Sequence, residues 1–234
     1  MDAWKHAKNR IYQSGDAGMK EDIVVKTFTR VATTAVALLL GGTFAASAGW
    51  LDGLFGGNAE DAFAQCRQGA VAGDIGGPFE LVNAQGETVT DTDVITEPTL
   101  LYFGYTFCPD VCPFDVARNA EAIDILEQRG MSATPVFVSI DPERDTPEVV
   151  GDFADTFHDK MIGLTGSKEQ VDVASKAYRT YYRAQEAEDE YYLVDHSTFT
   201  YLVLPEAGFV DYFRREVTPE QMADRVGCFV DAAS

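Results

Sequence analysis

Basic side chains are scarce in this sequence. Its 234 residues include 18 lysines and arginines against 38 aspartates and glutamates, so the formal net charge is −20 at pH 7. Nucleic-acid binding depends on lysine and arginine side chains that neutralise phosphates, and a chain this acidic is a poor candidate for it. We expect a solvated acidic surface, which could also steer the protein towards a basic partner.

Histidine and cysteine are also rare, with three and four copies, and internal repeats and low-complexity segments are lacking. The length suits one ordinary domain with additional segments. Hydrophobic residues make up 46% of the chain, which is enough to bury a core. Because histidine and cysteine are so rare, a metal site made from them can use only a few side chains.

One long run, residues 31–51 (VATTAVALLLGGTFAASAGWL), lacks formal charge altogether. A helix of this length measures roughly 30 Å, the thickness of a bilayer core. Residues 1–30 carry six basic and four acidic side chains, whereas acidic residues follow the run. Positive charge remains in the cytoplasm, so we expect a cytoplasmic segment 1–30, a single transmembrane anchor 31–51 in the inner membrane, and residues 52–234 on the periplasmic side. A signal peptide cleaved near residues 46–48 is the alternative, and it exports the same part.

The exported part begins with a segment rich in glycine and polar residues, 52–65, which we expect to be a tether. A single domain over residues 66–234 follows it. Two short strands around a turn at residues 83–86 predict an N-terminal β-hairpin. The apolar runs 99–107 and 134–140 are typical of strands that are buried on both faces.

The remaining elements alternate between helix and strand. In chain order they are predicted as helices over 113–128 and 147–157, a short strand over 161–164, a helix from 167 to about 182, a loop over 186–190, strands over 198–204 and 209–213, and a last helix from Thr218. This order predicts an α/β sandwich that combines parallel strands with a closing antiparallel hairpin.

Cys108 and Cys112 stand in FCPDVCP, where a buried strand ends and a helix begins. A spacing of four places both thiols on one side of the first helical turn. A helix N-terminus lowers the pKa of a thiol and favours the thiolate, which binds metal or attacks a disulfide. The carboxyl ends of strands in such sheets are also where ligands bind. A plain disulfide between the two is the alternative, although closing so small a loop adds little stability.

Two histidines in the exported part could complete a metal site. His196 lies in VDHSTFTYL, just before a predicted strand, and we expect it to pass beside the two cysteines. His158 ends a predicted surface helix, and we expect it to be exposed. Two thiolates and one imidazole form a soft set that suits Cu(I) and, with a weak additional ligand, Cu(II). Structural zinc requires a fourth ligand, and none is evident, although Asp110 or water could supply one.

Cys66 and Cys228 form the outer pair, one before the first predicted strand and one in the last helix. The ends of a domain are often close together, and an oxidising compartment favours disulfides. We therefore predict a Cys66–Cys228 disulfide. Two unrelated free thiols are the alternative.

Three segments resemble the Sco/SenC/PrrC family, in the right order and over roughly residues 68–230. They are YTFCPDVCP (105–113), SIDPERDTPE (139–148) and VDHSTFTYLV (194–203). A Cys-x3-Cys pair alone is weak support, whereas the three segments together are highly specific. The Cys66/Cys228 pair is not part of the general pattern of the family.

The resemblance implies a thioredoxin-like fold and a copper ion bound by Cys108, Cys112 and His196. It also implies delivery of that copper to the binuclear copper centre of cytochrome c oxidase subunit II. Some members of the family are discussed as thiol-disulfide reductases for the oxidase cysteines or as redox sensors. Another copper chaperone or a thiol reductase is a further candidate partner.

Two classes of function are compatible with these residues: a metallochaperone without turnover, and a thiol-disulfide oxidoreductase. The Cys-x3-Cys spacing differs from the Cys-x2-Cys of most disulfide exchangers. Oxidoreductases of the thioredoxin type usually have a cis-proline before the corresponding strand, whereas this chain has the sequence DHST at residues 195–198. The supporting residues of a peroxidase are also lacking. We therefore expect a metallochaperone, with the oxidoreductase as the alternative.

One further segment, DPERD, contains Asp141, Glu143 and Arg144. We expect a turn with local salt bridges there. A turn that faces the metal site or a partner is the alternative.

Overall fold

A computed structural model of the chain describes residues 59–67, 69, 73–186 and 191–234. All of these residues belong to one compact unit, Ala48–Ser234. Within the described ranges, no helix combines the length and the apolar character needed to cross a bilayer. The predicted cytoplasmic segment 1–30 and the predicted anchor 31–51 lie outside these ranges, so both stay predictions.

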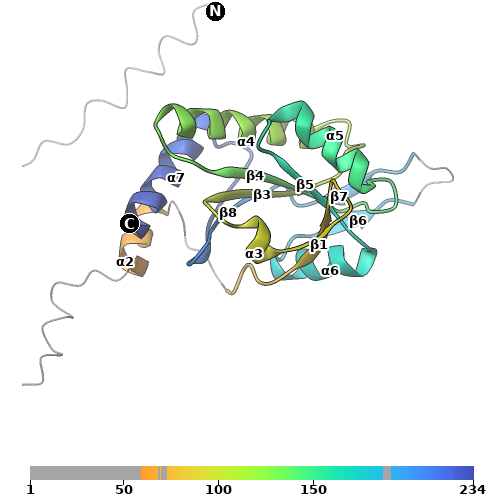
Figure 1. The fold of residues 1–234 in the computed structure, drawn as a ribbon, viewed down its shortest axis with the longest axis horizontal. Helices are drawn as coiled ribbons and strands as arrows, with labels where there is room; N and C mark the ends of the chain where they lie inside the picture. Colours follow the sequence, from red (N-terminus) through yellow and green to blue (C-terminus); the bar gives the residue numbers. More distant parts are fainter. Residues whose placement is uncertain (1–58, 68, 70–72, 187–190) are drawn as a thin grey trace, which may run out of the picture. The chain divides into compact units, whose positions relative to one another are not determined.

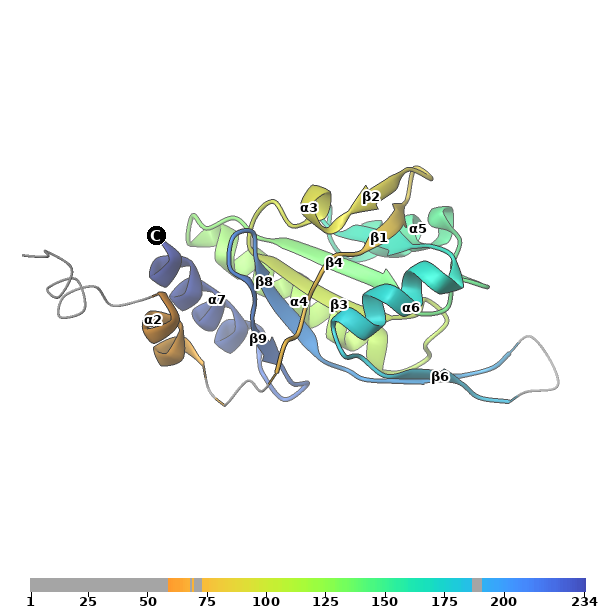
Figure 2. The ribbon, with the colours of Figure 1, turned by 90° about the horizontal axis from the view of Figure 1, so that it is seen from below.

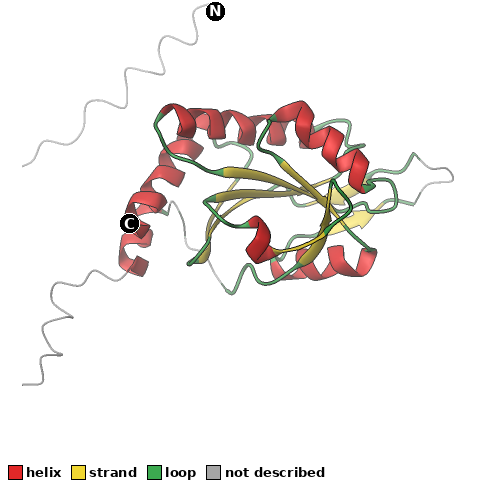
Figure 3. Ribbon diagram, viewed as in Figure 1, coloured by secondary structure: helices red, strands yellow, loops and turns green. Residues whose placement is uncertain are grey.

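Helices and strands alternate along the described part of the chain (Figures 1 and 3). The helices are α2 (Ala59–Cys66), α3 (Asp91–Val94), α4 (Val111–Gln128), α5 (Pro147–Phe157), α6 (Lys168–Ala177) and α7 (Pro219–Ala233). The strands are β1 (Glu80–Asn83), β2 (Thr88–Thr90), β3 (Thr99–Gly104), β4 (Thr134–Ser139), β5 (Ile162–Thr165), β6 (Tyr182–Ala184), β7 (Val194–His196), β8 (Thr200–Leu204) and β9 (Gly208–Phe213).

Seven strands form the main sheet in the order β2-β1-β5-β4-β3-β8-β9. The central strands β3, β4 and β5 are parallel, and the hairpins β1–β2 and β8–β9 add antiparallel strands at the two edges. Every residue of β3 is buried, because this strand lies between β4 and β8 and is covered on both faces. The predicted N-terminal hairpin and the predicted mixture of parallel and antiparallel strands are both confirmed.

Helices cover both faces of this sheet (Figure 1). Helices α4 and α5 lie on one face and α6 lies on the other. Successive side chains of a strand point to opposite faces. Accordingly, the hydroxyl of Tyr102 in β3 donates to Asp115 of α4 at 3.1 Å, whereas the ring of Phe103 lies 5.5 Å from that of Tyr178 beside α6. Strand β3 therefore links the two layers of the core.

Three helices begin at the residues that the sequence predicts. Thr146, Ser167 and Thr218 each accept a hydrogen bond from the backbone N–H three residues later, at 3.3 to 3.4 Å. The N-caps of α6 and α7 are complete capping boxes, and α5 and α7 have proline in the first turn. These local signals are enough to fix where each helix starts.

Helix α6 is shorter than predicted, since it ends at Ala177 and not near residue 182. Arg179 adopts a left-handed conformation with φ of 51°, and the N–H of Thr180 bonds back to the carbonyl of Ser175 at 3.0 Å. A left-handed residue ends a helix in this way, but the position is usually glycine. Because arginine occupies it here, the sequence carries no stop signal.

The segment that was predicted as a tether is helical from Ala59 onwards. Helix α2 packs on α7, where the ring of Phe63 lies 5.5 Å from that of Phe229. Phe63 and Cys66, three residues apart, give this short helix an apolar face. Residues 52–58, which hold the glycines of the predicted tether, lie outside the described ranges.

Strands β6 and β7 form a separate two-stranded ribbon. Neither strand was predicted, since Tyr182 was placed in a helix and His196 just before the strand that forms β8. Tyr182 is paired with His196 in this ribbon. Figures 1 and 2 both show the ribbon at the opposite end of the domain from α7. His196 is therefore presented by an arm and not by the main sheet.

Candidate metal centre

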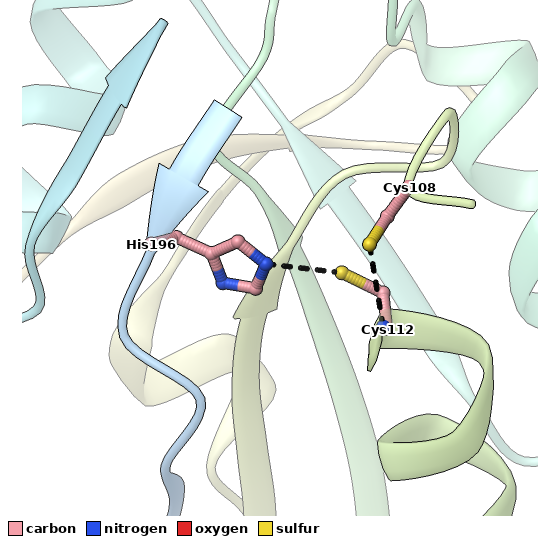
Figure 4. Close-up of side chains that lie close together, drawn as sticks. All are labelled: Cys108, Cys112 and His196. Atoms are coloured by element: carbon pink, nitrogen blue, oxygen red, sulfur yellow. Dashed lines mark hydrogen bonds between the residues drawn. The ribbon is translucent and has the colours of Figure 1, made fainter. Parts of the chain in front are cut away.

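Cys108 and Cys112 lie where the chain leaves β3 and enters α4 (Figure 4). Cys112 belongs to the first turn of the helix, but Cys108 precedes it in the connecting loop. The prediction that both thiols lie on the first helical turn is thus only half correct. The Sγ atom of Cys108 accepts a hydrogen bond from the backbone N–H of Cys112 at 3.4 Å. The sulfur therefore satisfies one of the N–H groups that the first turn of a helix leaves without a partner in the helix. Both thiols are free and buried.

Gly104, the last residue of β3, makes room for the Cys112 thiol. A Cβ atom at this position would lie 2.9 Å from Cys112 Sγ and 2.8 Å from the ring of Tyr102. Contacts this short are essentially never tolerated without movement. The absence of a side chain at Gly104 is therefore what allows the sulfur to sit against the end of the strand.

His196 extends from β7 towards the same point (Figure 4). Its Nε2 atom lies 3.4 Å from Cys112 Sγ, and its Nδ1 atom lies 2.8 Å from the carbonyl oxygen of Ser197. A carbonyl can only accept, so Nδ1 carries the proton and donates it. The lone pair of Nε2 then points at the sulfur, in the tautomer that a metal requires.

Two tyrosine rings hold the imidazole from the side. The rings of Tyr105 and Tyr102 lie 5.7 Å and 6.3 Å from the His196 ring, both in edge-to-face geometry. The Tyr105 hydroxyl also accepts the backbone N–H of Val194 at 3.3 Å. Neither tyrosine is predicted from the sequence to be part of the site. The only available signal was their position in and directly after the buried strand that leads to Cys108.

The three predicted ligands converge in the fold. The potential ligand atoms of Cys108, Cys112 and His196 all lie within 4.8 Å of one another. This set is soft and contains no carboxylate, so it suits Cu(I) better than a hard cation. It also lacks the fourth protein ligand of a structural zinc site. Asp110, the candidate for a fourth ligand, is exposed and does not belong to the cluster.

The two thiols differ in acidity. The pKa of Cys108 is lowered, because its sulfur accepts hydrogen bonds from the Cys112 thiol and from the N–H groups of Cys112 and Asp110. The pKa of Cys112 is raised, because this thiol donates to Cys108 and is deeply buried. Cys108 is thus the thiolate of the pair, and Cys112 is the proton-bearing partner.

A second group of potential ligands, Asp124, Glu127 and His158, is explained by hydrogen bonds and one ion pair with neighbouring groups. His158 was predicted to be exposed, but its side chain is only 10% exposed. Its Nδ1 accepts the N–H of Lys160 at 3.0 Å, so Nε2 carries the proton and faces Asp124 at 3.4 Å. Glu127 forms an ion pair with Lys160. Every group that could bind a cation here already has a partner.

Cys66 and Cys228 are joined by a disulfide, with their Cα atoms 5.7 Å apart. The bond connects α2 to α7 across a sequence separation of 162 residues. The helices that carry them, α2 and α7, lie at the end of the domain opposite the β6–β7 ribbon (Figure 1). The pair is therefore structural and separate from the metal-binding cluster.

An α/β domain that brings two free cysteines and one histidine together belongs to the class that binds soft metals or exchanges disulfides. The SCO1/SenC family model matches residues 67–231 of the chain. Protein SenC of Rhodobacter capsulatus is 56% identical over 174 residues, which cover 74% of this chain and 79% of SenC. The chain therefore belongs to the SCO1/SenC family.

Solved structures agree with this assignment. Arabidopsis thaliana ScoI with copper bound matches with a TM-score of 0.64 and 44% identity, over 67% of this chain and 98% of ScoI. BsSco, a member of the Sco family of cytochrome c oxidase assembly proteins in which a disulfide switch was identified, matches with a TM-score of 0.57 and 25% identity, over 72% and 99%. The thioredoxin-like α/β fold is thereby confirmed. The chain spans about half the length of the mitochondrial SCO1 homologues of A. thaliana and Homo sapiens that it matches, 49% and 47%.

Proposed function

We propose that this protein binds one copper ion through Cys108, Cys112 and His196 and delivers it to a respiratory oxidase. The observation that carries the proposal is the convergence of these three side chains, whose ligand atoms lie within 4.8 Å of one another. The Nε2 lone pair of His196 already faces the site, and Cys108 is the more acidic thiol. Copper bound to the related ScoI of A. thaliana supports the same metal here.

The acceptor that we propose is the binuclear copper centre of cytochrome c oxidase subunit II. Support comes from BsSco, which belongs to a family of cytochrome c oxidase assembly proteins. With only three protein ligands, a copper ion bound here would be open to a further ligand, such as a thiolate of the acceptor. Another copper chaperone is the proposed donor of the ion.

We also propose that the domain works on the periplasmic side of the inner membrane, anchored by residues 31–51. The charge distribution around that run supports the orientation. The Cys66–Cys228 disulfide supports an oxidising compartment. In such a compartment a reductase is needed to keep Cys108 and Cys112 reduced, so that both thiols can bind copper.

The second candidate function is reduction of a disulfide in a partner protein, and the unequal acidity of the two thiols favours it. The Cys108 thiolate would attack the partner's disulfide and release one thiolate. Cys112 would then attack the mixed disulfide, which releases the second thiolate and leaves a Cys108–Cys112 disulfide. Two electrons pass to the partner, whose two sulfurs take up protons, one of them from Cys112.

Anaerobic titration of the reduced full chain with Cu(I) tests the proposal. We expect one copper per chain, with binding lost in Cys108→Ala and Cys112→Ala. His196→Ala should weaken binding on the order of 100-fold, since even outer-shell changes cost 10- to 100-fold. His158→Ala is the matched control and should bind normally.

Two outcomes would decide against the chaperone. Unchanged affinity in His196→Ala would refute the three-ligand site. No copper in the wild type, together with rapid disulfide exchange, would favour the reductase. Delivery itself is tested by mixing the loaded protein with the copper-free soluble domain of subunit II and following the absorption of the binuclear centre.

A further inference from the structure

His196 depends on side-chain contacts for its position. In the described part of the chain, β6 and β7 pair only with each other, and no ladder joins them to the main sheet. The two cysteines, in contrast, are fixed by β3 and α4. The contacts that hold the ribbon against the domain therefore contribute to the distance between the imidazole and the thiols.

Arg144, in the DPERD segment, contacts Tyr192 in the chain that leads into β7. Its Nη1 donates to the carbonyl of Tyr192 at 2.9 Å, and its guanidinium lies over the Tyr192 ring at 3.7 Å from the ring centre. Asp141 closes the unit, since it accepts Arg144 Nε at 2.5 Å and the Tyr192 hydroxyl at 2.6 Å. Tyr192 is four residues before His196 on the same arm.

The same guanidinium also reaches the segment that carries Cys108. It lies 5.0 Å from the ring centre of Phe107 and 5.7 Å from that of Tyr105. Phe107 directly precedes Cys108, and Tyr105 contacts the imidazole of His196. One side chain, 13% exposed, therefore touches both of the segments that supply ligands.

The loop that carries Arg144 is itself locked to the cysteine segment. The fully buried carboxylate of Asp145 accepts the N–H and the hydroxyl of Thr106, at 3.0 and 2.5 Å, and the hydroxyl of Ser139 at 2.6 Å. Thr106 is two residues before Cys108. Asp145 thus fixes the loop on the cysteine side, and Arg144 extends from it to the histidine side.

We propose that Arg144 is a positioning residue for His196, and that it sets the spacing between the imidazole and the Cys108–Cys112 pair. The proposal deepens the copper function and rests on it. The sequence suggests a turn held only by local salt bridges. For such a turn the Asp141–Arg144 pair would be enough, and the contacts of Arg144 with Tyr192 would not be needed. Stacking combined with a hydrogen bond to the Tyr192 carbonyl requires the planar, multi-donor guanidinium, and lysine cannot replace it.

Cu(I) affinity of the full chain, measured in two backgrounds, tests this role. Arg144→Met should weaken binding about 10- to 100-fold in the wild-type background. In the His196→Ala background it should add little, because the ligand that it positions is already gone. Arg144→Lys should bind Cu(I) as weakly as Arg144→Met. Arg183→Met removes an exposed arginine from the same ribbon and should bind Cu(I) with normal affinity. An equal loss in both backgrounds, no loss in either, or full recovery with lysine would overturn the proposal.

A readout without metal separates this inference from the copper function. Hydrogen exchange of the Val194 amide, which donates to Tyr105, reports how firmly the ribbon is held. Arg144→Met should speed this exchange about tenfold relative to Arg183→Met, while the amides of β3 stay protected. Failure of the wild type to bind copper would refute the proposed function alone. Unchanged exchange at Val194 would refute the positioning role, whether or not copper binds.

Discussion

The Nε2 atom of His196 lies 3.4 Å from the Sγ atom of Cys112, although 84 positions separate the two residues in the chain. The thiol belongs to the first turn of α4 and the imidazole to the β6–β7 ribbon. With Cys108, they form a site that exists only while both thiols are reduced and the ribbon stays in place.

Oxidation of the Cys108–Cys112 pair should abolish copper binding, because a disulfide removes two of the three ligands. The measurement is copper stoichiometry before and after mild oxidation, with recovery after treatment with a thiol reductant. The Cys66→Ser/Cys228→Ser variant should respond in the same way, which assigns the effect to the inner pair. Copper bound stoichiometrically to the oxidised protein would exclude the dithiol as the ligand.

Alkylation of Cys108 should depend little on pH between about 6 and 8. An ordinary cysteine becomes protonated and loses its reactivity when the pH falls below the usual pKa of a thiol. The pKa of Cys108 is lowered, so this residue stays a thiolate at the same pH. Cys112, whose pKa is raised, should react slowly throughout this range. Mass spectrometry after timed alkylation measures both sites separately.

Cys112→Ala provides the control for that experiment. The hydrogen bond from the Cys112 thiol is the largest cause of the lowered pKa of Cys108. Removing it should move the alkylation profile of Cys108 towards that of a free thiol. A profile that stays flat in Cys112→Ala would show that another group stabilises the thiolate.

Loss of the Cys66–Cys228 disulfide should destabilise the domain without affecting copper. The bond closes a loop with a sequence separation of 162 residues, so its removal should lower the free energy of unfolding by about 2–5 kcal/mol. Urea unfolding of Cys66→Ser/Cys228→Ser measures this change. Thiol reductant should lower the stability of the wild type to the same level and leave the variant unchanged. Weakened copper binding in the folded variant would contradict the separation of the two sites.

Gly104→Ala should disturb the metal site directly. The added methyl group would lie 2.9 Å from Cys112 Sγ and 3.0 Å from the Phe137 ring, so the thiol must move. We expect a loss of about 1–3 kcal/mol in the free energy of unfolding and weaker copper binding. Gly69→Ala is the matched control, because nothing lies within 4 Å of its added methyl group. Equal affinity in the two variants would show that the close packing at Gly104 is not required.

Much of the fold could be predicted because its signals are local. The buried strand β3, the hairpin β1–β2 and the starts of α5 and α7 each follow from apolar runs, turn residues or caps within a few positions. The end of α6 could not be predicted, since it depends on a left-handed arginine in place of glycine. Helix α2 was missed because its stability comes from packing on α7 and not from its own short sequence.

The candidate site was predictable in its ligands but not in its supports. Cys108, Cys112 and His196 have rare side chains in segments that resemble a known family, so their convergence was expected. Gly104 acts through a contact between segments far apart in the chain, which no local pattern reveals. For Arg144, a turn that faces the metal site was only the alternative to a turn with local salt bridges, and its contact with Tyr192 likewise joins distant segments. The end of a surface helix is usually exposed, so the sequence predicts His158 at the surface. In the structure its side chain is largely buried, with Nδ1 bonded to the N–H of Lys160 and Nε2 facing Asp124.

X-ray absorption spectroscopy at the copper edge of the full chain, reduced and loaded with one equivalent of Cu(I), tests the central claim most directly. The three-ligand site predicts two sulfur neighbours and one nitrogen neighbour, with the nitrogen contribution lost in His196→Ala and both sulfurs retained. Copper surrounded by nitrogen and oxygen alone, or a spectrum unchanged by His196→Ala, would contradict it.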